Sequence, residues 1–400
     1  MPQLHCHLHT PASAPSALSS DLLAALDFAS AAAPAAFHRT LPEYAPTPLR
    51  SLTALAASLG LAGLHVKDES FRFGLNAFKA LGGSFAAARV LAGRLGLAGQ
   101  AFTFADVAGP AARARLGQLT FVTATDGNHG RGVAWAARVL GHRAVVYLPE
   151  GSAASRVENV RREGAEAAVT DLNYDATVAL AERRAAENGW ILVQDTSWPG
   201  YEAVPLDIMR GYTTIAAEIV PELAATPPTH VFLQAGVGSF AAAMAACLKS
   251  VWPDLSVIVV EPDRADCLFR TAKAGDGSLH VVEGRMDSMM AGLCCGVPSM
   301  QAWAVLERTA GAFISCSDDY SAQGMRALAA PPAGDAAIVS GESGAVTCGV
   351  VRALMTDPGL SGIRDELGLD ASARVLLVST EGDTDPENYA RVLAGADGRG

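Results

Sequence analysis

Several features of nucleic-acid-binding and membrane-surface proteins are missing from this sequence. Aromatic residues make up only 6% of the 400 residues, the net charge is −11, and Lys and Arg form no extended run. Proteins that bind nucleic acid or anionic membrane surfaces need clusters of basic side chains. We therefore expect neither nucleic acid nor a membrane among the partners of this protein.

Cysteine is scarce, and its spacing fits none of the common metal-binding patterns. The seven cysteines include one adjacent pair, Cys294 and Cys295, but no Cys-x-x-Cys motif and no Cys/His set with metal-ligand spacing. An odd number in a chain of this length predicts reduced thiols in a cytoplasmic protein, although a disulfide that includes Cys294 or Cys295 stays open. We expect no metal site.

The first residues lack the features of a signal peptide. The segment 1–16 has no basic start followed by an apolar stretch, which a secretory signal would require. His5, His7 and His9 alternate along it. We interpret them as part of a loose tail rather than a metal site, because no anchoring structure is expected around them.

What the sequence does contain is an alternation of short aliphatic runs with longer alanine-rich stretches. Such alternation predicts parallel β-sheets covered by helices on both faces. A length of 400 residues indicates either two domains or one large α/β unit. The expected strands are residues 121–125, 144–148, 166–170, 191–194, 231–234, 257–260, 336–339 and 375–378.

Small, polar or acidic residues follow six of these strands. Asp126 comes after the first, Asp195 after the fourth and Ser379 after the last. In open parallel sheets, ligands bind outside the carboxyl ends of the strands, so these side chains are expected to share one cleft. Each of these motifs alone is common in loops. The prediction of a shared cleft rests on their repeated position after the strands.

The segment 231–248 has eighteen residues without a charge, which is long enough to suggest a membrane span. Glycine and serine near its start interrupt the apolar run, so we interpret it as a strand, a loop and a helix. The loop Gly236-Val237-Gly238-Ser239 lets the backbone approach a ligand, and a helix N-terminus favours a phosphate. It lacks the third glycine of the dinucleotide fingerprint and the Gly-Lys-Ser/Thr of a nucleotide P-loop.

Lys79 is the one strongly basic residue between Arg72 and Arg89, and it shortly precedes Gly82-Gly83 in an apolar run. An amine in apolar surroundings loses proton affinity and becomes a nucleophile that can form a Schiff base. Alone, such a lysine more often packs its stem on apolar surface while its ammonium reaches water. Together with a separate phosphate loop, it indicates a site for pyridoxal 5′-phosphate, which needs an amine and a phosphate cradle.

The motifs occur in an order that resembles one known family. From about Phe37 to Tyr389 the chain carries LNAFKALGGSFA, TDGNHGRGVAWAA, VQDTSWPGY, QAGVGS, SGESGAV and VSTEGDTD. This series resembles diaminopropionate ammonia-lyase, which belongs to the fold-type-II, tryptophan-synthase-β-like pyridoxal phosphate enzymes. In that group at large, the sequence of the asparagine loop is Ser-Gly-Asn-His. The acid before the glycine, Asp126, separates this family from threonine deaminases.

The resemblance implies a role for each motif. Asn128 would hydrogen-bond the ring hydroxyl of the cofactor, and Asp195 would meet the distal ammonium of the substrate. The implied cofactor-binding residues are Lys79 as the Schiff-base lysine, Asn128, Gly236, Val237, Gly238, Ser239 and either Ser379 or Thr380 facing the ring nitrogen. The implied catalytic residues are Lys79, Asp126 and Asp195.

The resemblance also implies a fold of two doubly wound open-sheet α/β domains. We expect residues 1–88 and 204–400 to form a large domain that binds pyridoxal phosphate. Residues 89–203 would form a smaller α/β domain, with the active site in the cleft between the two. The family suggests a homodimer.

The implied reaction is the α,β-elimination of D- and L-2,3-diaminopropionate to pyruvate and two ammonia. A first alternative is another fold-type-II lyase or dehydratase that acts on serine or threonine. Asp126 and Asp195 argue against it, because a hydroxyl substrate has no second ammonium to pair with them. A synthase or racemase on the same scaffold, and a non-catalytic small-molecule-binding α/β protein, also stay open.

Overall fold

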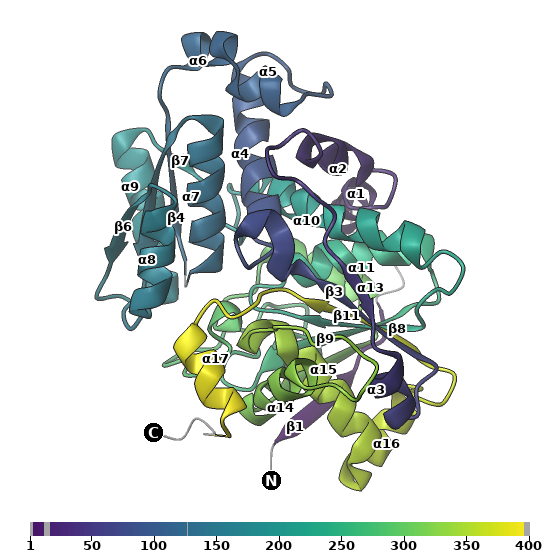
Figure 1. The fold of residues 1–400 in the computed structure, drawn as a ribbon. Helices are drawn as coiled ribbons and strands as arrows, with labels where there is room; N and C mark the ends of the chain where they lie inside the picture. The colour runs from purple at the N-terminus through teal and green to yellow at the C-terminus, as the bar shows by residue number, and fades with distance from the viewer. Residues whose placement is uncertain (1–2, 12–16, 126, 396–400) are drawn as a thin grey trace.

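The computed structural model describes residues 3–11, 17–125 and 127–395. Its chain forms two β-sheets with helices around them, and Figure 1 shows the smaller sheet beside the upper part of the larger one. The strands are β1 (Leu4–Leu8), β2 (Leu49–Ser51), β3 (Gly63–Asp68), β4 (Thr120–Ala124), β5 (Arg143–Leu148), β6 (Glu166–Val169), β7 (Ile191–Leu192), β8 (His230–Gln234), β9 (Ser256–Pro262), β10 (Ala312–Cys316) and β11 (Arg374–Ser379).

The helices alternate with these strands along most of the chain. They are α1 (Ala17–Ala25), α2 (Ala32–His38), α3 (Thr53–Ser58), η1 (Glu69–Gly74), α4 (Ala80–Arg94), α5 (Phe104–Ala108), α6 (Pro110–Leu116), α7 (Asn128–Leu140), α8 (Ala154–Arg162), α9 (Tyr174–Asn188), α10 (Ala203–Glu222), α11 (Ser239–Val251), α12 (Cys267–Ala274), η2 (Ala291–Leu293), α13 (Met300–Thr309), α14 (Asp318–Ala329), α15 (Glu342–Thr356), η3 (Pro358–Leu360), α16 (Ser361–Glu366) and α17 (Pro386–Leu393).

The larger sheet has seven strands in the order β1-β10-β9-β8-β11-β3-β2. Its five central strands are parallel, whereas β1 and β2 close the two edges in antiparallel pairing. The smaller sheet has four parallel strands in the order β6-β5-β4-β7. The predicted fold class, α/β with two open sheets wound by helices, is confirmed.

Residues along the central strands are buried on both faces, as expected for parallel sheets covered by helices. In β8, Val231 and Leu233 join the core with α10 and α11, whereas Phe232 joins the core with α14 and α15. This alternation follows the period of two in a strand. Figure 1 shows α14 and α15 below the large sheet and α10 and α11 above it.

All the expected strands are present except one. Residues 336–339 form no strand, because Ala336, Ala337 and Val339 are exposed and only Ile338 is buried. The backbone N–H of Ile338 donates to the carbonyl of Leu328 at 2.8 Å, so this segment packs beside α14 as a loop. Four strands were not predicted: β1, β2, β3 and β10.

The interpretation of the N-terminus as a loose tail is wrong for residues 4–8. They form β1, which pairs with β10 in the register His5 to Ser315. Leu4 and Cys6 pack against the core that covers the lower face of the large sheet. The alternation Leu-His-Cys-His-Leu is a strand pattern, but its partner lies about 310 residues further along the chain.

Residues 3–11, 17–125 and 127–395 contain neither a membrane-spanning helix nor a metal cluster. No helix in this part of the chain is long and apolar enough to cross a membrane. No group of three His, Cys, Asp or Glu side chains there could hold a metal ion. The segment 231–248 is the strand β8, a loop and the helix α11, as predicted. The expected domain boundary at residues 88 and 89 falls inside α4 and stays a prediction.

Candidate active site

A cavity lies at the carboxyl ends of β8 and β11, facing the start of α7. Most of the predicted site residues line it, namely Lys79, Asn128, Asp195, Gly236, Val237, Gly238, Ser239 and Thr380. Ser379 is not among the lining residues, and Asp126 lies outside the described residues.

The segment before Lys79 is paired with the segment that follows β11. The backbone N–H of Phe78 donates to the carbonyl of Thr380 at 3.1 Å, and that of Gly382 donates to the carbonyl of Asn76 at 3.0 Å. These bonds hold the start of α4 beside Thr380, although the two segments are about 300 residues apart in the sequence. Lys79 therefore reaches the cavity from a fixed backbone position.

The glycine pair that follows Lys79 allows close helix packing. A Cβ atom on Gly82 would lie 2.6 Å from the ring of Tyr212 on α10. A Cβ atom on Gly132, in α7, would lie 2.8 Å from the backbone nitrogen of Ala80. Such distances leave no space for a side chain, so the first turn of α4 is packed tightly between α7 and α10. This packing fixes the direction in which Lys79 points.

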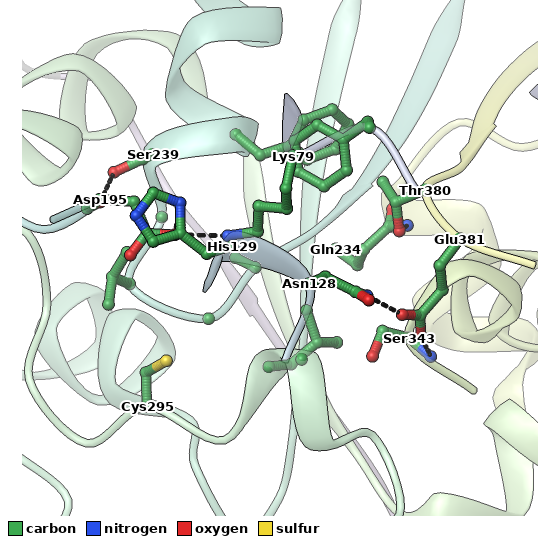
Figure 2. A pocket seen from close by; sticks show the side chains of 18 of the residues that line it. Lys79, Asn128, His129, Asp195, Gln234, Ser239, Cys295, Ser343, Thr380 and Glu381 are labelled. Atoms are coloured by element: carbon green, nitrogen blue, oxygen red, sulfur yellow. Dashed lines mark hydrogen bonds and ion pairs between the residues drawn. The ribbon is translucent and has the colours of Figure 1, made fainter. Parts of the chain in front are cut away.

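Lys79 forms an ion pair with Asp195 inside the cavity. Its Nζ donates to Asp195 Oδ2 at 2.5 Å, and the two side chains are 19% and 5% exposed. Figure 2 shows the two side chains meeting beside His129. Burial alone would raise the pKa of Asp195, but the neighbouring His129 and Lys79 lower it to about 2. Asp195 is therefore an ionised, nearly buried acid that needs a cation beside it.

His129 lies next to the same carboxylate oxygen of Asp195. Its Nε2 donates to the carbonyl of Val193 at 2.8 Å, which leaves Nδ1 as the unprotonated nitrogen. Nδ1 lies 3.8 Å from Asp195 Oδ2. Burial lowers the pKa of His129, so the ring is neutral near pH 7. Of the two neighbours, Lys79 is therefore the cation that holds Asp195 ionised at that pH.

The loop from Gly236 to Ser239 joins β8 to α11. Gly238 has φ of +100°, a left-handed conformation that favours glycine. A Cβ atom on Gly236 would lie 3.1 Å from the Sγ atom of Cys295. The first N–H groups of a helix have no partner within the helix, so the start of α11 can bind an anion. Ser239 Oγ donates to the carbonyl of Asp195 at 2.6 Å, which ties this loop to the acid.

The structure distinguishes the two hydroxyls after β11. Thr380 lines the cavity. The Oγ of Ser379 instead donates to Ser340 Oγ at 2.7 Å, away from the cavity. Between the two predicted alternatives, we therefore assign Thr380 as the hydroxyl that can face a bound ring.

Glu381 was not predicted as a site residue, and it connects three segments of the cavity wall. The Nδ2 of Asn128 donates to its Oε2, as Figure 2 shows, and the backbone N–H of Ser343 donates to its Oε1 at 2.9 Å. Because a carboxylate only accepts hydrogen bonds, Glu381 fixes the amide orientation of Asn128. The available signal was an acid directly after a strand in VSTEGDTD.

These residues fit pyridoxal 5′-phosphate. The cavity offers an amine at Lys79, a glycine loop at a helix N-terminus for the phosphate, and Thr380 and Asn128 for polar atoms of a ring. Three buried polar atoms on its wall, His129 Nδ1, Gln234 Oε1 and Ser343 Oγ, have no hydrogen-bond partner within the described residues. Buried polar atoms are normally paired, so unpaired ones at a cavity wall favour a polar ligand.

The comparisons with known proteins agree with this geometry. A family model described as pyridoxal-phosphate dependent enzyme matches residues 40–381. The chain therefore has the fold and site of a fold-type-II pyridoxal phosphate enzyme.

Individual relatives narrow the family further. A diaminopropionate ammonia-lyase from Salmonella typhimurium is 49% identical over 364 residues, which is 90% of each chain. The holo form of the Escherichia coli diaminopropionate ammonia lyase superimposes with a TM-score of 0.90 at 42% identity, covering 99% of this chain and 98% of that one. A structure of the same enzyme with an aminoacrylate-PLP azomethine reaction intermediate gives 0.89 at 41% identity, with the same coverage. The chain belongs to the diaminopropionate ammonia-lyase family.

Proposed function

We propose that this protein catalyses the α,β-elimination of 2,3-diaminopropionate, both D and L, to pyruvate and two ammonia. The observation that carries the proposal is the ion pair of Lys79 with Asp195 in the cavity. It combines the amine that pyridoxal phosphate needs with an ionised acid for a substrate that has a second ammonium. The names of relatives that are 46–49% identical over about 90% of the chain support it.

The reaction removes the Cα proton and then breaks the Cβ–N bond. When bound, pyridoxal phosphate supplies an electron sink for the pair left on Cα. That pair forms the Cα–Cβ double bond as the protonated β-amino group leaves as ammonia. The released 2-aminoacrylate takes up one water and gives pyruvate and the second ammonia.

The residues of this chain bind, orient and move protons in that sequence. Lys79 is the base that removes the Cα proton of one isomer. General-base catalysis of this kind accelerates proton removal by ~10²–10⁴-fold. Asp195 binds the distal ammonium, since a buried ionised acid needs a cation beside it whenever Lys79 moves away. An ammonium is also the form in which the β-nitrogen can leave.

An assay on a panel of amino acids tests the proposal. Purified holoenzyme is given D- and L-2,3-diaminopropionate, D- and L-serine and threonine, and pyruvate and 2-oxobutyrate are measured. We expect pyruvate from diaminopropionate at the highest kcat/KM. Higher kcat/KM on serine or threonine would instead identify a dehydratase, and no turnover with cofactor bound would favour a binding protein.

Replacing Asp195 with asparagine is expected to impair diaminopropionate more than serine. Truncating one partner of a buried charge pair costs ~2 kcal/mol or more, so the ratio of the two kcat/KM values should fall by roughly 30-fold or more. Serine serves as the matched control, because it meets the same cavity without a distal ammonium. An equal loss on both substrates would mean that Asp195 acts only by holding Lys79.

Asp126 is proposed as the second base, acting on the D isomer. The α-protons of D and L isomers lie on opposite faces of the cofactor once the carboxylate is anchored, so one base cannot serve both. Asp126 itself lies outside the described residues, and its neighbours Thr125 and Asn128 line the cavity. Lys79 would take the proton of the L isomer.

The expected result for Asp126→Asn is therefore specific to one isomer. Activity on D-diaminopropionate should fall by about 10²-fold or more, the range of general-base catalysis, while much of the activity on L-diaminopropionate remains. Steady-state kinetics on the two pure isomers measure this. A proportional loss on both isomers contradicts the two-base proposal and leaves Asp126 a positioning residue.

We further infer a homodimer in the cytoplasm. Cys6, Cys247, Cys267, Cys316 and Cys348 are free thiols in the structure, which is typical of reducing compartments. Light scattering on purified protein should give about twice the chain mass of 41.2 kDa. The mass of a single chain would contradict the dimer.

A further inference from the structure

Gln234 is the last residue of β8, and its side chain lies in the cavity wall beside β11. The residue is 2% exposed. Its Nε2 atom donates to the carbonyl of Val378 at 2.9 Å and to the Oγ1 atom of Thr380 at 2.8 Å. Figure 2 shows Gln234 next to Thr380, on the side of the cavity opposite Asp195.

The backbone determines which way the amide of Gln234 faces. A carbonyl oxygen can only accept a hydrogen bond, so the group that faces Val378 must be the NH₂. The reverse orientation would place two carbonyl oxygens 2.9 Å apart. The same NH₂ then gives its second hydrogen to Thr380 Oγ1, and Thr380 is an acceptor in that bond.

The hydroxyl hydrogen of Thr380 is consequently available to the cavity. Its oxygen already accepts from Gln234, and within the described residues no acceptor is recorded for its own hydrogen. The neighbouring Ser379 differs, because its hydrogen is used in the bond to Ser340. A ring nitrogen placed opposite Thr380 therefore meets a donor.

We propose that Gln234 is a positioning residue that makes Thr380 a hydrogen-bond donor and thereby keeps the ring nitrogen of pyridoxal phosphate unprotonated. An unprotonated ring nitrogen accepts the bond, whereas a protonated one would face a second hydrogen. The proposal rests on the cofactor assignment above and not on which amino acid is the substrate. An unprotonated ring is the weaker electron sink, which favours elimination over transamination.

The variant that tests this inference is Gln234→Glu. A glutamate oxygen in the place of Nε2 carries at most one hydrogen, and Val378 accepts it. With that hydrogen on Val378, the oxygen can only accept from Thr380, so the hydroxyl of Thr380 turns away from the ring and presents a lone pair to it. A protonated ring nitrogen then becomes the better partner.

The readout is the ¹⁵N resonance of enzyme reconstituted with pyridoxal phosphate labelled at the ring nitrogen. We expect the position of a neutral pyridine in the unmodified protein and a shift toward that of a pyridinium in Gln234→Glu. The ratio of transamination to elimination on diaminopropionate should rise in the same variant. A pyridinium signal in the unmodified protein, or an unmoved signal in Gln234→Glu, overturns the proposal.

Thr380→Val provides the matched control, because it removes the hydroxyl through which Gln234 acts. It should weaken cofactor affinity about 10-fold, the loss of one hydrogen bond. Adding Gln234→Glu to Thr380→Val should then leave the resonance unmoved, and a shift in that double variant overturns the role of Thr380.

If Gln234→Glu fails to fold, Gln234→Met removes the donor without adding charge, and an unmoved signal there contradicts the proposal. Because the resonance is measured without substrate, a result that contradicts the role of Gln234 is distinct from a result that contradicts the proposed reaction.

Discussion

Replacing Lys79 with alanine is expected to abolish both turnover and the covalent link between the protein and pyridoxal phosphate. The variant lacks the amine that we propose attaches the cofactor and acts as the base for one isomer. Loss of the base alone lowers the rate by ~10²–10⁴-fold. Borohydride reduction followed by mass spectrometry measures the link, since the unmodified protein should carry the reduced adduct on the peptide that contains residue 79.

The control for Lys79→Ala is Lys79→Arg. Alanine leaves the buried Asp195 without its cation, which is destabilising by itself. Arginine keeps a positive charge near Asp195, but its guanidinium stays protonated and forms no link to the cofactor. Both variants should lack the adduct, and only alanine should lower the melting temperature markedly. A reducible adduct and near-normal turnover in either variant would show that another residue carries the cofactor.

Replacing Gly238 with aspartate is expected to abolish most cofactor binding while the protein still folds. A Cβ atom at this position would lie 3.1 Å from side-chain atoms of Leu268 and Ala302, and the backbone φ of +100° strains any other residue. The carboxylate also brings a negative charge to the N-terminus of α11, where the phosphate is expected to bind. We expect affinity to fall by about 10²-fold or more, because charge repulsion adds to a strain of roughly 1–3 kcal/mol.

Gly238→Ala separates the contribution of backbone strain from that of the negative charge. It introduces the same backbone strain and the same Cβ contacts without the charge. Titration of the apoprotein with pyridoxal phosphate should therefore rank the unmodified protein above Gly238→Ala and Gly238→Ala above Gly238→Asp. Equal affinity of the two variants would mean that no phosphate lies at this loop.

The local patterns of the sequence were sufficient for the fold class and for predicting most of the residues that line the cavity. Lys79 and the loop from Gly236 to Ser239 each carry their chemistry within a few residues, and both line the cavity. Asn128 and Asp195 line the same cavity because parallel strands bring their carboxyl ends to one edge of a sheet. In such topologies, the position of a residue after a strand already indicates which cavity it faces.

Tertiary structure decided the features that depend on partners far away in the chain. The N-terminal strand β1 exists only because β10 offers it an edge. The helix that carries Lys79 is packed against α7 and α10 through glycines whose neighbours are not sequence-local. The choice of Thr380 over Ser379 follows from where Ser340 and Gln234 lie.

The physical reason is the same in each case. Hydrophobic periodicity, glycine loops and helix termini act over a few residues, so the sequence by itself determined the α/β architecture and was enough to predict an amine at Lys79 and an anion-binding loop at Gly236 to Ser239. The hydrogen-bond partners of Asn128, Gln234 and Thr380 are set by sheet pairing and helix packing across 144 to 253 residues. Only the folded chain brings these donors and acceptors within bonding distance, so only the tertiary structure decided which polar atoms face the cofactor.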